Sequence, residues 1–125
     1  MAKNDEDYSV KIRVLSRDEL AMGPGKADLL DQIIKTGSIA AAGRAMNMSY
    51  KRAWDLVETM NNCFKTPVVE KSKGGAAKGG AVVTPFGKEI LDQYRSIQKK
   101  AHSAIKNDVD DFQKFLKHQS NSKKY

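Results

Sequence analysis

Apolar residues between positions 29 and 64 recur at three- and four-residue steps, which is the period of amphipathic helices. The first group at this spacing is Leu29, Leu30, Ile33 and Ile34. It lies between a glycine- and proline-containing turn at residues 23–25 and the helix-ending pair Thr36 and Gly37. This stretch is therefore predicted to form the first helix.

A second, short helix is predicted at residues 39–46, where alanine is frequent. The side-chain oxygen of Ser38 can accept a hydrogen bond from the first free amides of this helix. Its small side chains allow another helix to cross closely. Asn47 tolerates the left-handed conformation that a sharp turn requires, and Ser49 can cap a third helix.

The third helix is expected from Tyr50 to about Phe64. Its apolar stripe consists of Ala53, Trp54, Val57, Met60 and Phe64. The residues expected to face outward are Lys51, Arg52, Asp55, Glu58 and Asn62. Two helices joined by a tight turn, the second with one buried face, are typical of a helix-turn-helix.

Two regions carry strand signals. Between Tyr8 and Leu15, Val10, Ile12 and Val14 alternate with polar residues, which predicts an isolated strand with one buried face. Further along, the apolar runs 68–69 and 81–83 flank a glycine-rich stretch from Lys73 to Gly80. This arrangement predicts a hairpin with a long flexible tip.

A long last helix is predicted to begin at Thr84 and Pro85, because threonine caps a helix and proline loses no hydrogen bond at the first helical position. Its apolar stripe consists of Ile90, Tyr94, Ile97, Ala101, Ile105, Val109, Phe112 and Leu116. The stretch could form one continuous helix. Alternatively, Asn107 and Asp108 could break this helix and cap a separate final one. Residues 119–125 are expected to form a disordered tail.

The order helix, helix, tight turn, helix, hairpin, helix predicts a mainly α fold with a small β-hairpin, a winged helix-turn-helix. The 125 residues suffice for one domain and its appendages. We divide them into an N-terminal arm with a strand (1–24), the winged domain (25–87), a dimerisation helix or helices (88–118) and the tail (119–125). Because the apolar stripe of the last helix is too long to cover one small domain, it predicts a homodimer.

The charge balance favours a polyanionic partner, with 22 Lys and Arg against 15 Asp and Glu, a net charge of +7 and a pI near 9.5. The segment from Arg44 to Lys78 contains seven basic and three acidic residues, which gives it a net charge of +4. In a winged helix-turn-helix the start of the third helix approaches base edges, where Lys51 and Arg52 can donate to guanine O6 and N7 or to phosphates. Glycines at the hairpin tip let backbone amides approach phosphates closely.

The predicted contacts to double-stranded DNA are Ser49, Tyr50, Lys51, Arg52, Arg44, Lys71, Lys73, Gly74, Gly75, Lys78, Gly79 and Gly80. Trp54 is assigned to the core because it lies on the apolar stripe. Cys63, the only cysteine, is expected to be a small buried hydrophobic residue. His102 and His118 lack metal-ligand spacing and are expected to be solvated. No phosphate-binding loop, dinucleotide fingerprint or catalytic triad can be assembled, so neither an enzyme nor a cofactor or metal site is predicted.

Residues 25–94 resemble the DNA-binding domain of the ModE family of molybdate-responsive bacterial regulators. The residues that carry the resemblance are Gly37, Ser38 and Ile39, residues 48–54, Met60 and Asn61, Val69 and Glu70, and residues 84–87. The resemblance implies a transcriptional regulator of molybdate uptake or molybdoenzyme genes. The family is similar in outline to LysR-type regulators, whose winged domain continues into a long helix that pairs two subunits. That likeness also implies a homodimer, and two-fold symmetry would call for an inverted-repeat operator.

Full-length family members carry C-terminal β-barrel domains that bind the oxyanion, and this chain has no room for them before Tyr125. Molybdate is therefore implied by the family alone, while its binding domain is expected to be absent. The chain is then a stand-alone form, a partner of a separate effector-binding chain, or one domain cut from a longer protein.

Two other functional classes remain as alternatives: a protein-interaction module that uses the winged fold, and an architectural protein that binds nucleic acid without sequence preference through counterion release. A wing tip that is both glycine-rich and basic favours DNA binding over the interaction module. No run of eighteen apolar residues occurs, and the charged N-terminus differs from the start of a signal peptide, so no membrane association is expected and the predicted location is the cytoplasm.

Overall fold

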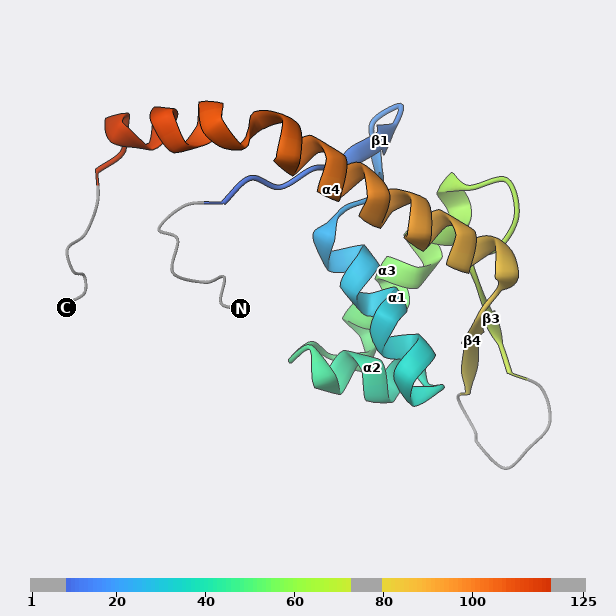
Figure 1. The fold of residues 1–125 in the computed structure, drawn as a ribbon. Coiled ribbons are helices and arrows are strands. Elements are labelled where there is room, and N and C mark those ends of the chain that lie inside the picture. The colour runs from blue at the N-terminus through green and yellow to red at the C-terminus, as the bar shows by residue number, and fades with distance from the viewer. Residues whose placement is uncertain (1–8, 73–79, 118–125) are drawn as a thin grey trace.

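The fold is built on three short helices that surround one hydrophobic core. The computed structural model describes residues 9–72 and 80–117. In it, α1 (Pro24–Thr36), α2 (Ile39–Ala45) and α3 (Tyr50–Cys63) pack against one another, as Figure 1 shows. The largest fully buried side chains come from these helices and the wing: Leu29, Leu30, Ile33, Val57, Met60, Val68 and Val83. The predicted helices are therefore confirmed, and their apolar stripes make the core.

Short-range signals position α2 and α3. The Ser38 hydroxyl accepts a hydrogen bond of 3.1 Å from the amide of Ala41, and the Ser49 hydroxyl accepts one of 3.1 Å from the amide of Arg52. Asn47 takes the left-handed conformation, with φ of 59°, in the turn between the two helices. These caps and this turn are the ones expected from the sequence, and together they fix the direction in which α3 begins.

A two-stranded wing follows α3. Its strands β3 (Val69–Lys71) and β4 (Ala81–Val83) are antiparallel, with Val69 opposite Val83. The amide of Ala81 donates a hydrogen bond of 2.9 Å to the carbonyl of Gly37, and Gly80 forms a bridge with Ser38. The root of the wing is thereby joined to the turn between α1 and α2.

The last helix begins where the sequence predicts. The Thr84 hydroxyl accepts a hydrogen bond of 2.9 Å from the amide of Gly87 and donates one of 2.8 Å to the carbonyl of Pro67. From there α4 (Pro85–Phe112) runs without interruption, followed by one 3₁₀ turn, η1 (Gln113–Phe115). Of the two alternatives, the continuous helix is therefore correct, because Asn107 and Asp108 lie inside α4.

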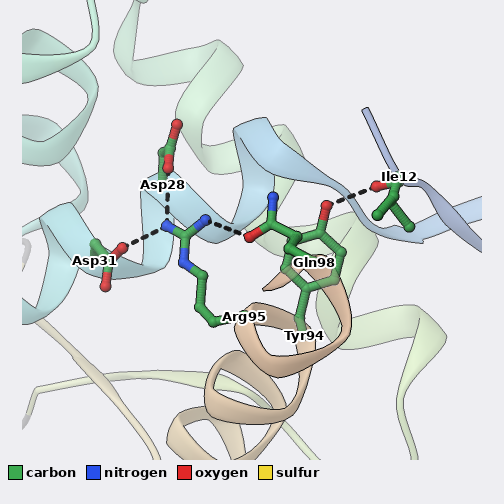
Figure 2. Close-up of polar contacts among 6 residues, drawn as sticks. All are labelled: Ile12, Asp28, Asp31, Tyr94, Arg95 and Gln98. Carbon is green, nitrogen blue, oxygen red and sulfur yellow. Dashed lines mark hydrogen bonds and ion pairs between the residues drawn. The ribbon is translucent and has the colours of Figure 1, made fainter. Parts of the chain in front are cut away.

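The first half of α4 packs on the body, and its second half extends beyond the three-helix body (Figure 1). The buried residues of α4 are Gly87, Leu91 and Tyr94, all in the first half. At the point of departure, the guanidinium of Arg95 forms ion pairs of 2.9 Å with Asp28 and 2.6 Å with Asp31 on α1, as Figure 2 shows. Hydrogen bonds to these carboxylates raise the pKa of Arg95 against the opposing effect of its burial. Arg95 therefore ties α4 to the outer side of α1.

The prediction of an isolated strand at residues 8–15 is wrong. The structure instead forms a hairpin of β1 (Val14–Ser16) and β2 (Glu19–Met22), and the partner strand β2 was missed. Residues 9–13 belong to neither strand. Their carbonyls are used by side chains of α4, since Tyr94 donates a hydrogen bond of 2.6 Å to Ile12 (Figure 2) and a ring nitrogen of His102 lies 3.1 Å from the carbonyl oxygen of Val10.

Two residue-level expectations also change. Cys63 is half-buried at the end of α3, with its thiol 3.8 Å from a carboxylate oxygen of Glu19, so the expectation of a buried position is wrong. His102 is exposed as expected, but its ring also contacts the N-terminal segment. His118 and the tail from residue 119 lie outside the described residues. The broad prediction of a mainly α winged helix-turn-helix with a long last helix is confirmed.

Candidate nucleic-acid interface

The first turn of α3 presents polar and basic side chains to solvent. Ala53, Val57 and Met60 on the opposite face are buried in the core, which fixes the rotation of the helix about its axis. Tyr50, which is 53% exposed, Lys51 and Arg52 consequently point outward, next to the capping residue Ser49. These four predicted contact residues thus come together on one accessible helix end.

The charges on this turn are available to a polyanion. Lys51 forms an ion pair of 3.3 Å with Asp55, one turn along α3, and both side chains are largely exposed. Exposed pairs of this kind contribute little to stability, so exchanging the carboxylate for a phosphate costs little. Within the described residues, the Arg52 side chain makes no ion pair.

Lys71 connects the wing to α3. Its ammonium group lies 5.4 Å from the centre of the Trp54 ring, within the range of a cation–π interaction. Trp54 is half-buried and packs against the core, as its place on the apolar stripe predicted. The contact of Trp54 with a wing lysine could not be predicted from the sequence, because it depends on how β3 returns past α3.

Asn61 is a structural residue of this face that the helical pattern did not single out. Its side-chain oxygen accepts hydrogen bonds of 2.8 and 3.2 Å from the amides of Val68 and Val69, and its side-chain nitrogen donates one of 3.0 Å to the carbonyl of Val69. One side chain on α3 therefore satisfies three backbone groups at the start of the wing. Only the family resemblance had included Asn61.

The remaining predicted DNA contacts divide into three groups. Arg44 is exposed near the end of α2. Gly80 is buried at its bridge with Ser38. The others fall outside the described residues: Lys73, Gly74, Gly75, Lys78 and Gly79.

The stripe predicted for dimerisation has two parts: its first residues pack on the body of the molecule, and the others lie on the second half of α4, beyond the body. Ile90 is half-buried against the core and Tyr94 is buried within its own domain. Further along α4, Ile97 is 46% exposed and Phe112 is 59% exposed. Between them, Ala101, Ile105 and Val109 are half-buried, and Leu116 is exposed after the 3₁₀ turn.

Among residues 9–72 and 80–117, no group of three His, Cys, Asp or Glu side chains is arranged to hold a metal ion. In the same residues, no helix has the length and apolar character needed to cross a membrane.

Comparison with models of known protein families found no match. Individual relatives do match. The molybdenum-pterin-binding protein MopB of Rhodobacter capsulatus is 47% identical over 85 residues, which is 68% of this chain and 32% of that protein. The DNA-binding transcriptional dual regulator ModE of Escherichia coli is 34% identical over 95 residues, which is 74% of this chain and 36% of that protein. The chain thus spans about a third of the length of the curated relatives it matches.

Solved structures share the fold at low sequence identity. The DNA-binding domain of CbnR, solved in complex with DNA, superposes with a TM-score of 0.53 at 15% identity, covering 68% of this chain and 92% of that one. The LysR family transcriptional regulator VV2_1132 gives a TM-score of 0.52 at 11% identity, covering 75% of this chain and 30% of that one. Both agree with a winged helix-turn-helix that continues into a long helix.

Proposed function

This chain is a homologue of the ModE-type molybdenum regulators over about 70% of its length, and from that premise we propose that it is a DNA-binding transcription regulator that acts in the cytoplasm. The observation that carries the proposal is the exposed first turn of α3, where Tyr50, Lys51 and Arg52 stand outward on a helix fixed by its buried face.

The dimensions of this helix suit a DNA groove. An α-helix with its side chains is about 10–12 Å wide, and the major groove of B-DNA is about 12 Å wide. With α2 bracing α3, Arg52 and Lys51 reach base edges or the flanking phosphates, and Tyr50 contacts sugar or a thymine methyl. Ser49 and Arg44 lie where they approach the phosphate backbone.

The wing supplies the second contact. Lys71 lies at the edge of α3, and the sequence beyond it places Lys73 and Lys78 in a glycine-rich stretch. In this proposal the lysines neutralise phosphates beside the groove that α3 enters, and the glycines Gly74, Gly75 and Gly79 allow close backbone approach. These contacts strengthen binding without selecting sequence.

The regulator is proposed to act as a homodimer through the second half of α4. The contact set comprises Ile97, Ala101, Ile105, Val109, Phe112 and Leu116. A two-fold dimer presents two copies of α3, so an inverted-repeat operator is expected. The names of the relatives point to promoters of genes for molybdenum transport or use. The chain itself is proposed to bind DNA without a cofactor.

A binding titration tests this function. Fluorescent DNA from the region upstream of the protein's own gene is titrated at physiological salt, against random DNA of equal length, with and without molybdate. We expect preference for the upstream DNA and no effect of molybdate. Equal binding to both DNAs would replace the regulator with an architectural protein, and absence of binding would favour a protein-interaction module.

A further inference from the structure

Arg95 holds α4 at the point where this helix leaves the body formed by α1, α2, α3 and the wing. Its guanidinium forms ion pairs of 2.9 Å with Asp28 and 2.6 Å with Asp31, which lie three residues apart on α1. The same guanidinium donates a hydrogen bond of 3.0 Å to the side-chain oxygen of Gln98, about one turn along its own helix. Arg95 is thereby joined to α4 and to α1 at once, as Figure 2 shows.

A second contact leaves α4 in a different direction. The hydroxyl of Tyr94 donates its hydrogen bond of 2.6 Å to the carbonyl of Ile12, whereas the neighbouring Arg95 reaches toward α1 (Figure 2). Further along the helix, a ring nitrogen of His102 lies 3.1 Å from the carbonyl oxygen of Val10. The N-terminal segment and α1 therefore hold α4 from two directions.

These polar contacts matter because packing holds only the first half of α4. The buried residues of this helix are Gly87, Leu91 and Tyr94, and within the described chain no residue of α4 beyond Tyr94 is buried. From there the helix continues to Phe112, beyond the body (Figure 1). The contacts around Tyr94 and Arg95 therefore set the angle at which the projecting half of α4 leaves the body.

From this arrangement we infer that Arg95 is a positioning residue that sets the distance between the two copies of α3 in the homodimer, and with it the half-site spacing that the dimer accepts in DNA. The inference rests on the proposed function, which supplies the homodimer and its two half-sites. In a dimer joined through the projecting half of α4, one helix connects each body to the two-fold axis. The angle at Arg95 then determines where each α3 lies.

Small changes of this angle have large consequences for DNA binding. From Arg95 to Phe112 the helix is about 26 Å long at about 1.5 Å per residue, so a tilt of about 10° at Arg95 moves its far end by about 4–5 Å relative to the body. The rise of DNA is about 3.4 Å per base pair. Because half-site spacing must match the separation of the two recognition helices, a fixed angle accepts few spacings and a loose angle accepts several.

The contribution of Arg95 to direction can be separated from its contribution to stability. The side chains of Arg95, Asp28 and Asp31 are 36%, 58% and 43% exposed, and ion pairs as exposed as these stabilise a fold little. Their geometry is nevertheless specific, since a planar guanidinium that meets two carboxylates favours one arrangement of the helices over its neighbours. Loss of Arg95 should therefore loosen the angle of α4 while the body stays folded.

Operator spacing is the first test, made with the 125-residue chain. The half-sites that wild type protects in its upstream DNA are placed on duplexes whose spacer is shortened or lengthened by up to about four base pairs. Wild type should lose about tenfold or more in affinity when the spacer changes by about two base pairs, whereas Arg95→Ala should lose less than about threefold. Both should bind a single half-site equally. An unchanged spacing profile for Arg95→Ala would overturn the inference.

The matched control is Lys35→Ala, which removes an exposed positive charge from α1. Within the described residues Lys35 makes no ion pair, so this variant should keep the wild-type spacing profile.

A charge exchange tests whether the pair itself fixes the angle. Arg95→Asp places a third carboxylate beside Asp28 and Asp31 and should broaden the spacing profile. Adding Asp31→Arg restores an opposite-charge pair between α1 and α4, so the double variant should have a narrow profile again. A double variant as broad as Arg95→Asp alone would contradict the role of this pair.

A distance measurement tests the inference without DNA. Glu58 is exposed on α3, and Glu58→Cys in a Cys63→Ser background provides one spin-label site per chain. Electron–electron double resonance then measures the distance between the two copies of α3 in the dimer. The labelled chain with Arg95 intact should give one narrow distance distribution, and Arg95→Ala should broaden it. Equal widths, or no intersubunit distance in the chain with Arg95 intact, would overturn the inference.

These outcomes are separable from those of the proposed function. If wild type prefers its upstream DNA but Arg95→Ala keeps the spacing profile and the distance distribution, only the positioning role of Arg95 falls. If upstream and random DNA are bound equally, the sequence-specific regulator falls, and the distance distributions alone decide the role of Arg95.

Discussion

The hydroxyl of Tyr94 on α4 donates a hydrogen bond of 2.6 Å to the carbonyl of Ile12, which lies 82 residues earlier in the chain. Tyr94 is only 2% exposed, and its burial raises the pKa of its hydroxyl, which keeps the proton that this bond requires. Two helical turns further on, His102 lies against Val10. The N-terminal segment therefore runs antiparallel to α4, held at two points.

Replacing Tyr94 with Phe is expected to lower the free energy of unfolding by about 1 kcal/mol, because the half-buried carbonyl of Ile12 loses its partner while the ring stays in place. Urea unfolding measures the loss. Tyr50→Phe is the matched control, since its hydroxyl belongs to an exposed side chain and its removal should change stability little. Equal stability of wild type and Tyr94→Phe would mean that the segment is not held by this bond.

Gly87 is predicted to be intolerant of any side chain. A Cβ atom at this position would lie 2.3 Å from the carbonyl oxygen of Val68 and 2.9 Å from a methyl carbon of Val83. Gly87→Ala should therefore destabilise the chain by about 2 kcal/mol or more, because the wing must move away from α4. Gly25→Ala on α1 is the control: nothing lies within 4 Å of its Cβ position, and thermal unfolding should show no loss.

Local features of this fold could be read from the sequence because each depends on a few neighbouring residues. The Ser38, Ser49 and Thr84 caps were predicted correctly, as was the left-handed turn at Asn47. In each case a polar side chain satisfies amides within three residues, or a single residue tolerates an unusual φ. The exposed turn at Tyr50 followed from the helical period alone.

Features that depend on contacts distant in sequence could not be read in the same way. The alternation of Val10, Ile12 and Val14 predicts a strand, but periodicity does not reveal whether a carbonyl is bonded by another strand or by a tyrosine on a helix. The three hydrogen bonds of Asn61 likewise require the wing to return to α3. The burial of Gly80 follows from its bridge to the distant Ser38.

The burial of Lys26 also depends on contacts distant in sequence, and it should have a measurable effect on stability. It lies in the first turn of α1 with only 4% of its surface exposed, and its ammonium group donates a hydrogen bond to the carbonyl of Leu20. Burial lowers the pKa of Lys26 below its ordinary value of 10.5, and nearby Cys63 and Glu19 oppose this decrease. A lysine at a helix start gives no sequence signal that the fold will bury it.

The lowered pKa of Lys26 makes its contribution to stability depend on pH. Between the folded-state pKa and 10.5 the unfolded chain binds more protons than the folded chain, so the free energy of unfolding from this group rises with pH. Urea unfolding at pH 8 and near pH 10 should show wild type gaining stability relative to Lys26→Met. Lys35→Met, at an exposed position of α1, should show no such change relative to wild type. A difference between wild type and Lys26→Met that is constant or reversed with pH would contradict the prediction.

A substitution of Arg52 is expected to distinguish base-specific recognition of DNA from attraction to DNA by charge alone. It stands on the exposed first turn of α3, and within the described residues its side chain has no ion pair to give up. If its guanidinium bonds a base, Arg52→Ala should cost about 1–3 kcal/mol on the upstream DNA and clearly less on random DNA, as measured by fluorescence anisotropy at constant salt.

Lys11→Ala provides the control for this measurement, because it removes the same charge from an exposed position on the N-terminal segment. Its effect should be small and equal on both DNAs, since charges more than about 10 Å from the phosphates are largely screened. Equal losses for Arg52→Ala on upstream and random DNA would make Arg52 a phosphate contact. Specificity would then have to come from Tyr50, Lys51 or the shape of the DNA, because those are the remaining ways in which this helix end can select a sequence.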